Sequence, residues 1–236
     1  MYKVLIYFYL ILLLFINIFF WRFLYTKKKV LSIETKTLYR DDIKTGDVLL
    51  VDWQRFKNVL LSSFLRSSFM HPCIAVWENN DLFIVEIINY FNDEEYKGLI
   101  KVPFNKWHRI NKRGLILHNK LDIIGKKEDQ DKTREILKDN ILNFYNKYKK
   151  DIKEPVGLSY KWKRFLNPEP KYRKLTKFDD RVCTEITAMI LIECGVVKAN
   201  KSVESYNPDS FLGMKEFDTN KPYEYNESYL AKIDEA

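Results

Sequence analysis

The residues FDDRVCTEITAMIL, 178–191, predict the start of a helix that carries a thiol in its first turn. Asp179 or Asp180 can cap this helix by accepting a hydrogen bond from one of its first backbone N–H groups. Gly195 offers a stop, because glycine readily adopts the left-handed conformation that ends many helices. Between these limits, apolar side chains recur at helical spacing: Val182, Ile186, Met189 and Ile190.

Cys183 lies where the positive end of the helix dipole favours a thiolate over a thiol. The thiolate is the nucleophilic form of cysteine, and a cysteine nucleophile also needs a histidine base. In this chain the base must come from another segment. The alternative is that Cys183 is a small buried residue at a helix start.

The composition indicates a folded domain with an appendage. The chain has 236 residues, 46% hydrophobic and 15% aromatic, which is enough for a substantial core. The net charge of +8 comes from lysines spread along the chain, so solvation explains them better than a nucleic-acid surface does. No nucleic-acid partner is predicted. The 3 cysteines form no disulfide framework and favour a reducing compartment: Cys73, Cys183 and Cys194.

Residues 4–21 predict a transmembrane helix. Asn17 is the only strongly polar residue in this run, which at about 1.5 Å per residue would nearly span a bilayer core. Arg22 and residues 27–29 form a basic flank, which the positive-inside rule assigns to the cytosol. A cleaved signal peptide is the alternative, but no small-residue cleavage site follows the run. We therefore expect a single-pass membrane protein, attached through its N-terminal helix, with its domain in the cytosol.

Residues 71–77 and 82–88 predict a β-hairpin around the turn-forming residues ENND. With a two-residue loop, counting back along both strands puts Cys73 opposite Glu86. Side chains alternate across a strand, so His71, Cys73 and Glu86 share one face, with His71 and Glu86 as diagonal neighbours. An imidazole and a carboxylate in this arrangement can orient each other.

Local patterns predict the remaining elements, except that residues 54–69 are ambiguous between helix and loop. The predictions are a polar linker at 30–45, strands at 48–53, 99–102 and 114–117, an amphipathic helix at 129–150, a short helix from 207, and a loosely held polar tail from 218. His108 and His118 lie in polar segments and are predicted to be solvated or structural.

Six short motifs follow one another in a specific order. They are Gly46-Asp47-Val48-Leu49-Leu50, His71, Val85-Glu86-Ile87, Gly157-Leu158-Ser159-Tyr160, Val182-Cys183-Thr184-Glu185 and Asn207-Pro208-Asp209-Ser210-Phe211-Leu212. The histidine precedes the cysteine, which reverses the order of papain-like enzymes. The chain thereby resembles the circularly permuted branch of the NlpC/P60 superfamily, which includes YiiX-like bacterial proteins, a poxvirus protein and lecithin:retinol acyltransferase relatives.

The resemblance implies an α+β, permuted papain-like fold, with a small antiparallel sheet or half-barrel packed against helices. The catalytic domain would cover 46–217, after an anchor and basic flank at 1–29 and a linker at 30–45, and before a polar tail at 218–236. Cys183 would be the nucleophile, His71 its base and Glu86 the group that orients His71, while Tyr160 would add a hydrogen bond near the oxyanion. The implied function is a membrane-anchored cysteine amidase or peptidase that cleaves an amide or ester through a thioester, without a cofactor or metal.

Several alternatives stay open. One is a thiol acyltransferase or lipase-like enzyme acting on lipid esters, although Val182-Cys183-Thr184 differs from the Asn-Cys-Glu of the acyltransferase relatives. Another is a non-catalytic binding protein on the same fold. Cys73 is a rival nucleophile, but a strand offers it no helix dipole, and Cys194 is expected to pack in the core. A zinc site of His71, Cys73 and Cys183 lacks the paired ligand spacing typical of zinc.

Overall fold

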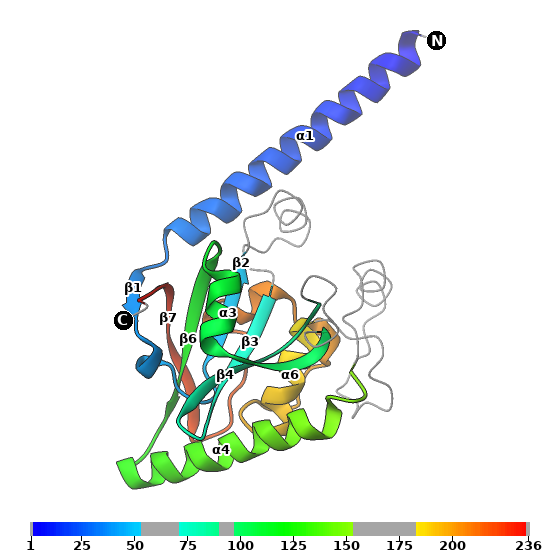
Figure 1. Cartoon of the computed structure of the whole chain (residues 1–236). Coiled ribbons are helices and arrows are strands. Elements are labelled where there is room, and N and C mark those ends of the chain that lie inside the picture. The colour runs from blue at the N-terminus through cyan, green and yellow to red at the C-terminus, as the bar shows by residue number, and fades with distance from the viewer. Residues whose placement is uncertain (1, 53–70, 90–96, 153–182, 235–236) are drawn as a thin grey trace.

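A seven-stranded sheet with helices on both faces forms the body of the chain in the computed structural model (Figure 1), which describes residues 2–52, 71–89, 97–152 and 183–234. The chain is α+β, but the sheet is a mixed one of seven strands, not the small antiparallel sheet or half-barrel that the sequence predicted. The strands are β1 (Thr35–Leu38), β2 (Val48–Asp52), β3 (His71–Glu78), β4 (Asp81–Asn89), β5 (Lys97–Pro103), β6 (Leu115–Ile123) and β7 (Tyr223–Ile233). The α-helices are α1 (Tyr2–Leu31), α3 (Phe104–Asn111), α4 (Lys127–Tyr148) and α6 (Cys183–Glu193), and the 3₁₀-helices are η1 (Arg40–Asp42), η3 (Val203–Ser205) and η4 (Pro208–Met214).

The strands lie in the order β1-β7-β6-β2-β3-β4-β5. β1 and β7 pair in parallel, and the other neighbours pair antiparallel. The hairpin of β3 and β4 has the predicted register, because Glu78 pairs with Asp81. Asn79 and Asn80 have φ angles of 52° and 65°, which suits the tight turn that matches the twist of a two-stranded hairpin.

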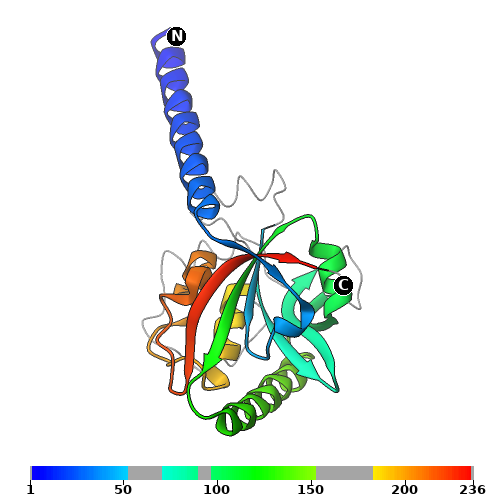
Figure 2. The same cartoon turned by 90° about the vertical axis from the view of Figure 1, so that its left-hand side faces the viewer.

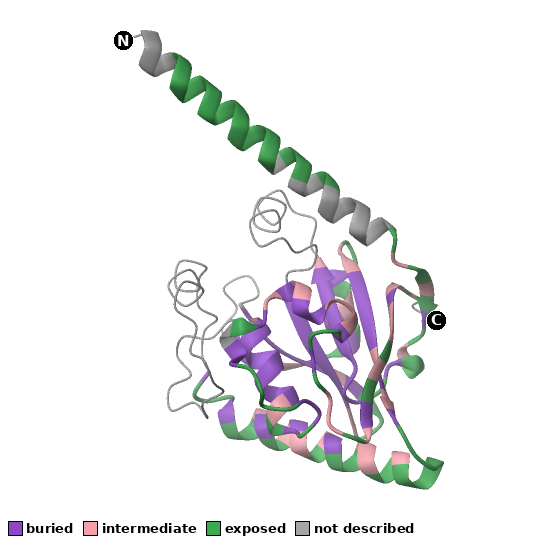
Figure 3. Cartoon of the chain, turned by 180° about the vertical axis from the view of Figure 1, so that it is seen from behind, coloured by how far each residue is buried: buried purple, intermediate pink, exposed green. Residues whose placement is uncertain are grey.

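Each face of the sheet has its own hydrophobic core, because side chains alternate along the strands. In β2, Val48 and Leu50 belong to the core under α4, α6 and η4, and Leu49 and Val51 to the core under α3. Figure 3 shows the buried residues concentrated in the sheet and on the inner side of these helices. The predicted helix at 129–150 is confirmed as α4, whose buried stripe faces the sheet: Leu137, Ile141, Phe144 and Tyr148.

The structure differs from the prediction at both ends of the domain. Residues 30–45 were predicted as a polar linker, but they include β1 and η1. The prediction of a loosely held tail from Asp218 is wrong, because β7 pairs with β6 over most of its length. The sequence of this strand is mostly polar, because only Tyr223 and Tyr229 are buried and its other side chains are partly or fully exposed. It therefore lacks the apolar pattern by which a strand is recognised.

The predicted transmembrane helix is also wrong. The described residues include no helix with both the length and the apolar character needed to cross a membrane. The exposed side chains of the helix include large apolar residues such as Phe8, Leu14 and Trp21. The exposed side chains also include Tyr7, Tyr9 and Asn17, whose amide donates to the carbonyl of Leu13 at 3.1 Å. α1 leads away from the sheet in Figure 1.

Candidate active site

The β3–β4 hairpin brings a histidine and a carboxylate into direct contact. His71 opens β3, and Glu86 lies in β4 on the diagonal that the hairpin register predicts. The distance from His71 Nε2 to Glu86 Oε2 is 2.6 Å, and the two side chains are 4% and 0% exposed. A buried carboxylate needs partners to compensate for its lost hydration, and this contact provides one.

Helix α6 carries Cys183 at its first position, as predicted. The helix ends at Glu193, just before Gly195, the expected stop, whose φ is 77°. The N–H of Val196 donates to the carbonyl of Leu191 at 2.9 Å. Thr187 Oγ1 donates to the carbonyl of Pro72 at 3.1 Å, which ties α6 to the strand that begins with His71. The predicted caps, Asp179 and Asp180, lie outside the described residues.

His71 joins the cysteine to the carboxylate. Burial alone would lower the pKa of the His71 imidazole, but hydrogen bonds with Cys183 and Glu86, together with their negative charge, raise it to about 10. The ring nitrogen that contacts Glu86 is Nε2. The structure thus brings together three of the four predicted site residues. The fourth, Tyr160, lies outside the described residues.

Trp107 is a member of this cluster that the sequence analysis missed. It lies in α3, is fully buried, and donates from Nε1 to Glu86 Oε2 at 3.3 Å. Glu86 therefore has partners on two sides, His71 from the hairpin and Trp107 from α3. The sequence shows that residue 107 is a large aromatic side chain but does not indicate its contact with Glu86, because that contact joins elements that are not adjacent in the chain.

The other two cysteines have different surroundings. Cys73 is fully buried, and its Sγ lies 3.4 Å from the carbonyl oxygen of Leu49. Burial, with the charges of Glu86 and Cys183, raises the pKa of the Cys73 thiol well above its usual range. Burial and the charge of Glu193 raise the pKa of Cys194 to about 12. Both groups therefore favour the neutral thiol, which is a poor nucleophile.

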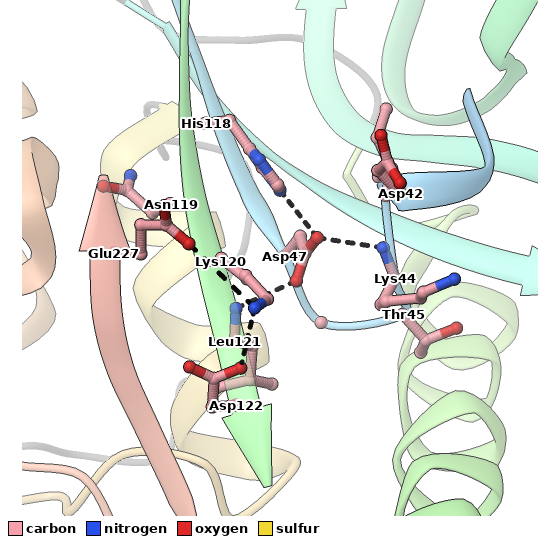
Figure 4. Close-up of polar contacts among 12 residues, drawn as sticks. Asp42, Lys44, Thr45, Asp47, His118, Asn119, Lys120, Leu121, Asp122 and Glu227 are labelled. Carbon is pink, nitrogen blue, oxygen red and sulfur yellow. Dashed lines mark hydrogen bonds and ion pairs between the residues drawn. The ribbon is translucent and has the colours of Figure 1, made fainter. Parts of the chain in front are cut away.

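A second histidine–carboxylate pair lies elsewhere in the sheet. His118 in β6 contacts Asp47 Oδ2 through Nε2 at 2.6 Å and the hydroxyl of Tyr229 through Nδ1 at 2.8 Å. Asp47 also accepts backbone hydrogen bonds from Lys44 and Leu121, both at 2.9 Å, as Figure 4 shows. This arrangement joins the turn before β2 to β6 and β7, so a structural role for His118 fits, whereas solvation does not.

The described residues offer no group of three or more histidine, cysteine, aspartate or glutamate side chains that could hold a metal ion. Residues 54–69, which are ambiguous between helix and loop in the sequence, lie outside the described residues. The described part of the candidate site is therefore its chemical centre: a thiol, an imidazole and a carboxylate in contact.

Comparisons with known proteins give a similarity to solved structures. No family model matches the sequence, and no curated protein matches it. Among solved structures, the chain is similar to the crystal structure of the metalloprotein yiiX from Escherichia coli O157:H7, with a TM-score of 0.40 and 13% identity. The match covers 63% of this chain and 64% of that one, so the chain spans less than two thirds of that protein's length.

Proposed function

We propose that the chain is a cysteine hydrolase that cleaves an amide or ester bond. The observation that supports this proposal is the contact of His71 with both Cys183 and Glu86. An imidazole between a thiol and a carboxylate can hold the thiol proton, and the carboxylate stabilises the imidazolium that results. The high pKa of His71 favours this charged form at neutral pH.

In the proposed reaction, the Cys183 thiolate attacks the carbonyl carbon of the substrate, and the carbonyl oxygen takes up the negative charge. The backbone N–H of Cys183, at the start of α6, donates to this oxyanion in the proposed reaction. His71 then gives its proton to the leaving nitrogen or oxygen as the bond breaks, leaving a thioester on Cys183. A water molecule, deprotonated by His71, attacks the thioester and releases the acid and the thiol.

Glu86 acts in this scheme as a positioning residue. It keeps Nε2 of His71 engaged, so that the other ring nitrogen faces the thiol. Trp107 steadies Glu86 through its indole N–H. Tyr160 completes the proposal as an additional hydrogen-bond donor to the oxyanion, by resemblance to the NlpC/P60 relatives.

Labelling with a thiol-reactive acyl probe tests the assignment of the nucleophile. We expect the probe to modify Cys183 selectively, because burial keeps the thiols of Cys73 and Cys194 neutral. Peptide mapping of the labelled full chain identifies the modified residue. Cys183→Ala should remove the label, and Cys194→Ala should retain it. Labelling that persists in Cys183→Ala and maps to Cys73 would contradict the assignment.

Product analysis then identifies the acyl acceptor. The labelled enzyme is incubated with water alone or with an added primary amine or alcohol. Release of the free acid in water, at a rate that the acceptors leave unchanged, supports hydrolysis. Transfer to an acceptor in preference to water would instead indicate an acyltransferase with the same nucleophile.

A further inference from the structure

Helix α3 has two faces with different environments. Trp107 and Asn111 are fully buried and face the sheet, where Trp107 reaches Glu86. Arg109 and Lys112 are exposed, and their spacing of three residues puts them on one outer face of the helix. The outer face is therefore cationic, while the inner face supports the candidate active site.

A cavity of about 520 Å³ lies along the outer side of α3. Its volume falls in the range that small-molecule sites usually occupy. In Figure 2 the C-terminal end of β7 and the short helix η1 are seen near α3. The lining residues on which the inference depends are Arg40, Phe104, Arg109, Lys112, Ile233 and Asp234.

Arg40 is held in place at this cavity. Its Nη2 donates to Asp81 Oδ1 at 3.2 Å and to the carbonyl of Asn80 at 3.3 Å. Its guanidinium also lies over the ring of Trp77, 5.2 Å from the centroid. The buried Nε of Arg40 has no hydrogen-bond partner among the described residues. A guanidinium held in this way loses little freedom when it binds an acceptor.

The charge of the lining favours a multivalent anion. The cationic lining residues are Arg40, Lys106, Arg109 and Lys112, and the acidic one is Asp234. Asp81 balances part of this charge through its ion pair with Arg40. Guanidinium groups bind phosphate through paired hydrogen bonds, and lysine adds a point charge. Phe104 and Ile233 add apolar surface to the same cavity, which suits the organic part of such a ligand.

We propose that this cavity binds a small organic phosphate, at a site separate from the thiol of Cys183. Titration calorimetry of the full chain with inorganic pyrophosphate, at constant ionic strength, tests the phosphate-binding part. We expect saturable binding that Arg109→Ala combined with Lys112→Ala weakens at least tenfold, because each lost charge-assisted hydrogen bond is worth about a factor of ten or more. A nucleoside diphosphate should bind more tightly than pyrophosphate, since it can also use the apolar surface.

The matched control is Lys126→Ala combined with Lys127→Ala, two exposed residues at the start of α4. This pair removes the same charge and should change the affinity by less than twofold. Circular dichroism checks that both double variants fold. Equal weakening by the two pairs, or no saturable binding of pyrophosphate, would overturn the proposal. Binding to vesicles of anionic phospholipid without binding to pyrophosphate would also overturn it, because it would indicate a lipid surface as the partner.

Discussion

Replacing His71 by alanine is expected to slow the acylation of Cys183 by p-nitrophenyl acetate by about 10²–10⁴-fold, the range that a positioned acid–base group typically contributes. The reason is that His71 is the group that contacts both the thiol and the carboxylate. Without it, the Cys183 proton has no buried imidazole to receive it. The release of nitrophenolate in the first turnover measures this rate.

Cys183→Ala should abolish the same burst, and the double variant His71→Ala with Cys183→Ala should be no worse than Cys183→Ala alone. Residues that act as a unit do not contribute additively. Cys194→Ala is the matched thiol control and should leave the burst unchanged, since Cys194 is buried in the core away from α6's first turn. A burst that survives in His71→Ala at the original rate would exclude His71 as the base.

Asp47→Ala is expected to lower the free energy of unfolding by about 3 kcal/mol or more, because each buried donor that loses its acceptor costs about 1–3 kcal/mol. Asp47 and His118 are both fully buried, and Asp47 accepts the backbone N–H groups of Lys44 and Leu121 as well as the contact from His118. The substitution leaves these donors buried without their acceptor, which adds a desolvation cost. Urea denaturation followed by circular dichroism measures the change.

Asp122→Ala is the control for this effect. Asp122 also lies in β6 and contacts a cation, Lys120, at 3.4 Å, but its side chain is 37% exposed. Pairs at this exposure usually contribute at most about 1 kcal/mol. Equal destabilisation by the two substitutions would mean that the buried network around Asp47 has no special role in holding β2, β6 and β7 together.

The β3–β4 hairpin was predictable because residues close together in the sequence determine its turn and its pairing. Asn79 and Asn80 tolerate the positive φ angles of a tight turn, and a two-residue loop fixes the pairing along both strands. The side-chain alternation then brings His71 next to Glu86 without further assumptions. The helix that begins at Cys183 was predictable for a similar reason, since its apolar spacing and the stop at Gly195 are both local signals.

Contacts between distant segments were not predictable from such signals. β7 is polar on one side and pairs with β1 in parallel across nearly the whole chain, so no nearby residue marks it as a strand. Trp107 reaches Glu86 from a helix that the sequence analysis did not identify. The sequence left His118 open between a solvated and a structural role, because its partners, Asp47 and Tyr229, lie far from it in sequence.

The protonation state of the His71 ring tests the central claim most directly. Nitrogen NMR of the full chain, labelled at histidine, follows the ring as pH is raised. We expect His71 to keep both ring protons at pH 8 and to titrate near pH 10, because Cys183 and Glu86 raise its pKa. Cys183→Ala and Glu86→Gln should each lower that pKa, since burial then opposes the charged ring with less compensation. A His71 ring that is neutral at pH 8 and insensitive to Cys183→Ala would contradict the proposed pairing of thiolate and imidazolium.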